Sequence, residues 1–140
     1  MNSKTVPFAV MLVTALIVCG GLIYIVYDRE EVTIEVEVVS GIYSNYVPDD
    51  LPNVGGQIKF TFTSNKSDRV EMCYPNIVFE KDGERKVFSN GTTLNWKSGQ
   101  TVPVRMVYYT GEYFDVTGWT YHFEIPDHMK VGGKYKLIEV

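Results

Sequence analysis

One thiol and two imidazoles are the side chains in this sequence best suited to chemistry. Cys73, His122 and His128 are residue types that serve as nucleophile, general base or ligand of a soft metal ion. Cys73 and His122 each fall inside an alternating strand pattern, however, where such groups are usually packed or solvated. No oxyanion or phosphate-cradling glycine motif accompanies them. We therefore predict no enzyme, no cofactor and no metal, and we keep a metal or redox domain using these three residues as an alternative.

Two further polar signals fall in predicted loops. Asn65 and Asn90 each begin an Asn-x-Ser/Thr sequon, which makes them candidate glycosylation sites if this part of the chain lies outside the cytoplasm. Chance accounts for so short a pattern equally well. Asp49 and Asp50 are oxygen ligands that calcium accepts, but adjacent carboxylates without the spacing of a calcium loop are by default solvated.

Aromatic side chains are concentrated towards the C-terminus, with seven between Tyr108 and Phe123. Some of them belong to the core, because tyrosine is frequent in strands for steric reasons. Others would point outward, and exposed aromatic residues are favoured anchors in protein interfaces. The candidate contact surface comprises Tyr43, Tyr46, Tyr109, Tyr113, Phe114 and Trp119.

The sequence pattern predicts that the elements that position these side chains are β-strands. Residues 57–63 alternate strictly, with Ile58, Phe60 and Phe62 predicted to point inward. Asp82-Gly83 predicts a hairpin turn, because glycine tolerates a positive φ. Further strands are predicted at 32–38, from 70, at 77–79, 86–88, 101–109, 119–125 and 135–140. The pattern predicts an all-β fold, an antiparallel β-sandwich of seven to eight strands.

Residues 41–56 interrupt this pattern with two prolines, three glycines and two adjacent aspartates. We expect a long loop there. Long loops in compact domains are often functional, and an inhibitor-like or solute-binding module using the 41–56 loop is a second alternative. A simple crossover between two sheets explains the segment equally well.

The segment IKFTFTSNKSDRVEMCYPN, residues 58–76, resembles the second-strand signature of bacterial and archaeal immunoglobulin-like domains of the BsuPI type. Residues 130–137 are similar to the entry into their final strand, and residues 98–101 to one of their turns. The resemblance covers about residues 55–140 and implies an immunoglobulin-like sandwich. No inhibitory loop of that family matches residue by residue, so the inhibitor activity is not implied.

A single uncharged run, residues 5–27, precedes the predicted strands. At about 1.5 Å per residue it is long enough to cross a bilayer once as a helix. It is too long for a cleaved signal peptide, and cleavage after its Cys-Gly-Gly cluster would leave an apolar N-terminus. Lys4 lies before the run and acidic residues follow it, which predicts a cytoplasmic N-terminus. We predict a transmembrane helix within residues 1–27 and an extracytoplasmic domain at 28–140.

Charge and cysteine content limit the function further. The formal net charge is −4, which argues against nucleic acid and against an anionic lipid surface as partners. Cys19 lies in the predicted membrane helix and Cys73 outside it, so no disulfide framework is expected. The sequence predicts a single-pass, membrane-anchored module in the cell membrane. We expect it to bind the bilayer through residues 5–27 and to contact another protein or the cell envelope as an accessory subunit.

Overall fold

The computed structural model describes residues 29–45 and 51–140. Ten β-strands account for most of these residues, so the all-β prediction is confirmed. The predicted transmembrane helix lies outside the described residues. No helix within the described ranges has the length and apolar character to span a membrane.

The largest sheet is built around β3 (Asn53–Ser64). β1 (Val32–Val38) and the short β2 (Tyr43–Asn45) pair with one edge of β3, and β8 (Thr101–Tyr109) pairs with the other. All three pairings are antiparallel. β10 (Tyr135–Glu139) completes the sheet by pairing with β1 in parallel.

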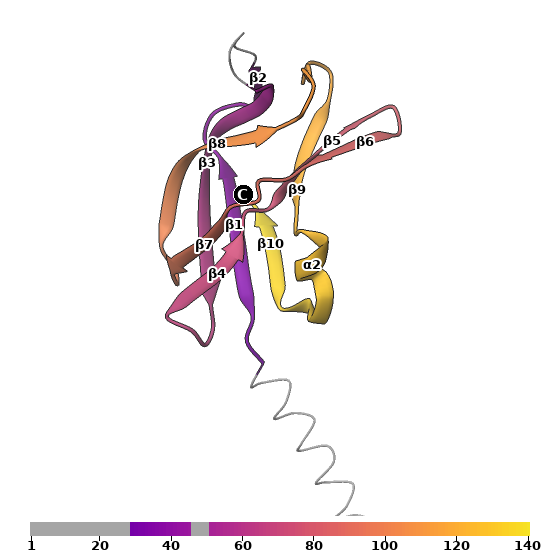
Figure 1. The fold of residues 1–140 in the computed structure, drawn as a ribbon. Helices are drawn as coiled ribbons and strands as arrows, with labels where there is room; N and C mark the ends of the chain where they lie inside the picture. Colours follow the sequence, from indigo (N-terminus) through magenta and orange to yellow (C-terminus); the bar gives the residue numbers. More distant parts are fainter. Residues whose placement is uncertain (1–28, 46–50) are drawn as a thin grey trace, which may run out of the picture.

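The remaining strands form two smaller sheets. β4 (Arg69–Cys73) pairs with β7 (Thr93–Lys97), and β5 (Asn76–Lys81) lies between β6 (Glu84–Phe88) and β9 (Thr120–Glu124). A short helix, α2 (Asp127–Lys130), and the 3₁₀ turn η1 (Val131–Gly133) lead into β10. Figure 1 shows β1, β3 and β8 on one side of the molecule, and β5, β6, β9 and α2 on the other.

Apolar and polar residues alternate along the strands, and the apolar side chains form the core that holds these sheets together. Ile34 lies opposite Phe62, and Val36 opposite Phe60, so that all four side chains share the inner face and are almost completely buried. The β6-β5-β9 sheet contributes Phe79 to the same core. Each such side chain contributes about 1.5–3 kcal/mol relative to an exposed one. The prediction that Ile58, Phe60 and Phe62 point inward is therefore confirmed.

Asp82 and Gly83 form the β5–β6 turn with φ of 49° and 79°. Positive φ at both central residues is the conformation that two-residue hairpins require. The hairpin predicted from this dipeptide is therefore confirmed. Lys81 pairs with Glu84 directly beside the turn, and Glu80 pairs with Arg85 one position farther along.

Three features differ from the sequence-based predictions. The described residues contain ten strands rather than seven or eight, because β2 has only three residues and β7 has only two apolar residues, Leu94 and Trp96, in a short strand that the sequence-based prediction does not include. The β1–β10 pair is parallel in a sheet expected to be antiparallel. Local alternation predicts a strand but does not specify the direction of its neighbour.

The prediction of a continuous loop over 41–56 is also wrong in part. Residues 43–45 form β2, which pairs with residues 53–55 at the start of β3, and Val54 is fully buried. Gly55 and Gly56 lie in β3, where neighbouring groups leave little room for a side chain: a Cβ on Gly55 would lie 2.9 Å from the Met106 carbonyl oxygen. The Asp49-Asp50 pair lies outside the described residues.

Candidate functional site

Three tyrosines form the most exposed aromatic set among the predicted contact residues. Tyr109 and Tyr113 are 61% and 58% exposed, and Tyr43 is 37% exposed. Tyr109 lies opposite Asn53, and Tyr43 lies opposite Gly55. Because these β3 positions are two apart, both tyrosines share the outer face of the largest sheet. We refer to Tyr43, Tyr109 and Tyr113 as the distal tyrosines.

A hydrogen bond joins the segment that carries Tyr113 to the strand that carries Tyr43. The Val116 N–H donates to Ser44 Oγ at 2.8 Å. In Figure 1, β2, the end of β8 and the segment 110–118 all lie at the end of the molecule farthest from the first described residues. The distal tyrosines therefore gather at one end of the domain.

Phe114 and Trp119 have a different environment from the distal tyrosines. The Phe114 ring lies 5.0 Å from Phe79, 5.4 Å from Phe88 and 5.1 Å from Trp119, measured between centroids. Both residues are half-buried and pack against the core. They fasten the segment 110–118 to the β6-β5-β9 sheet, which leaves Tyr113 as the exposed aromatic residue of that segment. Tyr46 lies outside the described residues.

The free edge of β8 is protected against further strand pairing. The Thr110 N–H donates to the Pro52 carbonyl, so the alternate residues 101, 103, 105, 107 and 109 turn their backbone groups away from β3. Pro103 has no N–H at this edge. Asn90 Nδ2 donates to the Val107 carbonyl at 3.0 Å and occupies that acceptor. Proline and capped carbonyls are the means by which edge strands avoid pairing.

Both sequon asparagines make structural hydrogen bonds. Asn90 caps the β8 edge, as described. Asn65 is exposed, and its Nδ2 donates to the Arg29 carbonyl at 3.3 Å, while its Oδ1 accepts from the Glu31 N–H at 2.8 Å. Glycosylation at Asn65 or Asn90 stays a prediction.

The structure separates the three residues of the metal or redox alternative. Cys73 and His128 line one open groove of about 490 Å³ near α2. His122 is not among the residues that line it, and its Nε2 lies 3.1 Å from Glu124 Oε2. Across residues 29–45 and 51–140, no three His, Cys, Asp or Glu side chains are grouped so that they could hold a metal ion.

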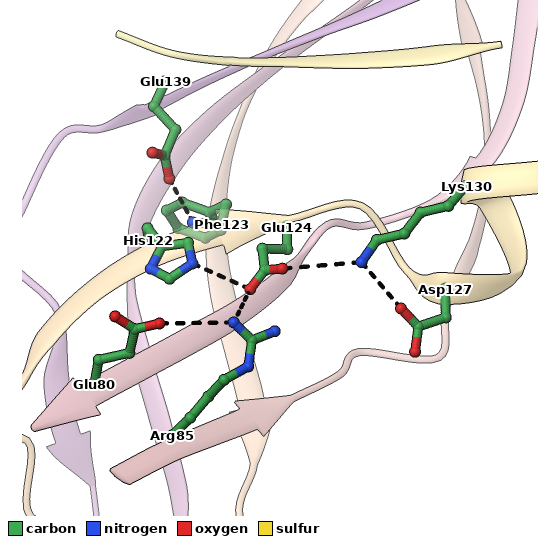
Figure 2. A network of polar contacts seen from close by, with 8 residues as sticks. All are labelled: Glu80, Arg85, His122, Phe123, Glu124, Asp127, Lys130 and Glu139. Atoms are coloured by element: carbon green, nitrogen blue, oxygen red, sulfur yellow. Dashed lines mark hydrogen bonds and ion pairs between the residues drawn. The ribbon is translucent and has the colours of Figure 1, made fainter. Parts of the chain in front are cut away.

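Glu124 is the centre of a polar network on the β6-β5-β9 sheet (Figure 2). Arg85 Nη1 lies 2.5 Å from its Oε2, and Lys130 Nζ lies 3.9 Å from its Oε1. The Arg85 guanidinium, and after it the His122 ring, lower the pKa of Glu124, although partial burial acts in the opposite direction. A carboxylate so fully engaged is held as an anion and is a poor proton acceptor. We refer to this set as the Glu124 network; its members are Glu80, Arg85, His122, Glu124, Asp127 and Lys130.

The Glu124 network joins elements that are far apart in the chain. Lys130 on α2 also lies 3.0 Å from Asp127, and the Phe123 N–H donates to the Glu139 carboxylate of β10. The network therefore links β5, β6, β9 and α2, and the Glu139 contact adds β10. Sequence reasoning missed it, because its partners come together only when the hairpin and β9 pair.

The described residues form an all-β fold of several sheets. Comparison with protein families, with curated proteins and with solved structures finds no match for this chain. Any function must therefore be argued from the geometry above.

Proposed function

We propose that this chain is a single-pass, membrane-anchored module whose extracytoplasmic domain binds another protein or the cell envelope as an accessory subunit. The observation that carries the proposal is that the entry point of the chain and the exposed tyrosines lie at opposite ends of the domain. The chain enters it at Arg29, two residues after the end of the uncharged run 5–27, and the distal tyrosines lie at the opposite end (Figure 1). A helix that spans the bilayer would thus present the tyrosines away from the membrane.

We propose further that the domain is an immunoglobulin-like sandwich. In that fold, strands A, B and E lie in one sheet and strands C and F in the other. β1, β3 and β8 take the places of A, B and E, and β5 and β9 take those of C and F. β10 departs from strand G of that fold, because it pairs with β1 in the larger sheet and reaches β9 only through Glu139. The order of the other five strands supports the resemblance drawn from the sequence.

Aromatic anchoring is the mode of contact that the surface favours. Tyrosine supplies a large contact area with few rotatable bonds, and it is enriched where interfaces gain most of their affinity. Addition of a partner strand at β8 is disfavoured by Pro103 and by the Asn90 cap on Val107. The partner therefore binds across the tyrosine-bearing end and not along this edge.

Photo-crosslinking in native membranes tests the contact. A photoreactive amino acid replaces Tyr109 or Tyr113 in the full chain, and Val87, which is 45% exposed on β6, serves as the control position. We expect one discrete crosslinked product from positions 109 and 113 and none from 87. Equal crosslinking from all three positions, or none from any, would contradict the proposed contact surface.

Alkaline extraction tests the anchor separately. The full chain should stay with the membrane pellet, and a chain that lacks residues 1–27 should be released. Protease added to spheroplasts with an intact cytoplasmic membrane should degrade the domain. A full chain recovered in the supernatant, or a domain protected from external protease, would rule out the proposed topology.

A further inference from the structure

A cationic groove lies at the end of the domain where the chain enters. The turn 64–69, together with Lys97 and Ser98, encloses an open groove of about 580 Å³. Three of its side chains, Lys66, Arg69 and Lys97, are cationic and exposed, and Asp68 is the one carboxylate among its lining residues. Arg69 Nε donates to the neutral Asn95 amide at 2.9 Å, which fixes the guanidinium without neutralising it. We call this the basal groove.

Asn65, in the wall of the basal groove, is bonded directly to the first described residues of the chain. Its side chain bridges the Arg29 carbonyl and the Glu31 N–H, and its backbone N–H donates to the Glu31 carbonyl at 3.2 Å. These contacts hold the groove beside the point where the chain enters the domain.

Glu30 makes further contacts between residues 29–31 and the rest of the domain. Its Oε1 accepts hydrogen bonds from Ser64 Oγ at 2.9 Å and Ser67 Oγ at 3.1 Å, and its Oε2 lies 3.2 Å from Lys134 Nζ. The Ser64 hydroxyl, and after it Lys134, lower the pKa of Glu30. Residues 29–31, which we call the entry segment, are therefore held by the turn 64–67 and by Lys134. These contacts fix the position of the entry segment against the domain.

The position of the groove follows from the length of the connection. Arg29 lies two residues beyond Tyr27, the last residue of the uncharged run, so at most about 7 Å of chain separates them. If that run spans the bilayer, as we propose above, Arg29 lies at the level of the lipid headgroups. Because Asn65 is bonded to Arg29 and Glu31, the basal groove lies at the same level.

From this geometry we propose that the basal groove binds the phosphate-bearing headgroups of anionic lipids in the leaflet that the domain faces. Lysine and arginine are the side chains that bind phosphate oxygens, and basic residues next to an anionic bilayer are attracted to its surface. The occupant is a headgroup of the anchoring bilayer because the groove is bonded to the chain that enters it. The inference rests on the proposed anchor.

The acidic charge of the whole chain does not oppose this binding. Charges farther apart than about 8–10 Å are screened at physiological salt, so the local sign at the groove decides. Glu30, which bonds to Ser64 and Ser67 in the groove, is paired with Lys134 at 3.2 Å. At the other end of the domain, the segment 110–118 carries Glu112 and Asp115 and no lysine or arginine (Figure 1). This difference favours the orientation in which the groove faces the lipid.

Hydrogen exchange of the full chain in lipid nanodiscs tests the proposal. Discs of phosphatidylcholine alone are compared with discs that contain about 30% phosphatidylglycerol. In the anionic discs we expect backbone amides of residues 65–69 and 97–99 to exchange about tenfold more slowly, and high salt should remove the difference. The triple variant K66Q/R69Q/K97Q should exchange equally fast in both kinds of disc.

A matched variant separates local binding from net charge. K59Q/K86Q/R105Q removes the same number of cations outside the groove and should keep the lipid-dependent protection. Protection that is absent in the unaltered chain, or that both triple variants lose equally, overturns the proposal. A chain that remains in the discs without lipid-dependent protection overturns only the groove, whereas a chain that is not retained in the discs overturns the anchor and the groove together.

Discussion

Tyr108 shows how one side chain connects the two halves of the core. It is 1% exposed, and its hydroxyl donates to the Pro75 carbonyl at 2.7 Å, just before β5 begins. Burial, and after it the neighbouring Tyr74, raise the pKa of the Tyr108 hydroxyl far above its ordinary value. The phenol therefore stays protonated and remains a donor under all ordinary conditions.

Removing that hydroxyl should be costly. Tyr108→Phe leaves the Pro75 carbonyl buried without its donor, which should lower the free energy of unfolding by about 1–2 kcal/mol. Urea unfolding of the full chain, followed by tryptophan fluorescence, measures the change. Tyr109→Phe is the control, because its side chain is exposed and the change should stay within about 0.5 kcal/mol. Equal losses in the two variants would show that the Pro75 contact does not stabilise the core.

Residue type alone does not predict which of the two neighbours Tyr108 and Tyr109 is buried. Tyr108 and Tyr109 are identical in chemistry, and alternation in β8 places one inside and the other outside. The sequence pattern predicted that Tyr109 points outward, and its side chain is 61% exposed. It did not separate Tyr113 from Phe114, because the segment 110–118 has no regular period and its side chains are sorted by the aromatic cluster around Phe79.

At the level of elements, the Glu124 network fastens a hairpin, a strand and a helix whose contacts are otherwise limited. Among the described strands, β6 pairs with β5 alone, and α2 has only four residues. Arg85 on β6 and Lys130 on α2 meet at Glu124 (Figure 2). The network thus contributes to the placement of both elements.

Acid should weaken this attachment. Because the pKa of Glu124 is lower in the folded chain than its ordinary value of 4.5, its contribution to stability is complete above about pH 4.5 and is lost as the pH falls through the folded pKa. Glu124→Gln should therefore lower stability at pH 7 and reduce the loss between pH 7 and acid. Denaturation midpoints measured across this range report the effect. The exposed Glu35→Gln is the control, and an unchanged acid dependence in Glu124→Gln would contradict the assignment.

For the whole molecule, hydrogen bonds from Asn65 hold residues 29–31, the segment through which the chain enters the domain. Asn65 supplies three of the hydrogen bonds that hold this segment, and none of them requires a buried side chain. This attachment can therefore be weakened without disrupting the core.

Asn65→Ala should release the entry segment while the sheets stay intact. We expect the Glu31 amide to exchange at least about tenfold faster, since it loses its acceptor, and the amides of β1 and β3 to change little. Asn95→Ala, which removes an exposed amide elsewhere on the same end of the domain, is the control. Faster exchange throughout β1 would show instead that Asn65 stabilises the sheet as a whole.

The sequence by itself determined the features that depend on residues close together along the chain. Alternation of apolar and polar residues specified β1, the centre of β3 and β8 with their buried faces, and Asp82-Gly83 specified the hairpin, because side-chain direction and turn conformation are local properties. Tertiary structure decided the parallel β1–β10 pair, the core position of Phe114, the partners of Glu124 and the cationic groove beside Arg29. Each of these depends on residues that lie far apart in sequence and come together only when the sheets assemble.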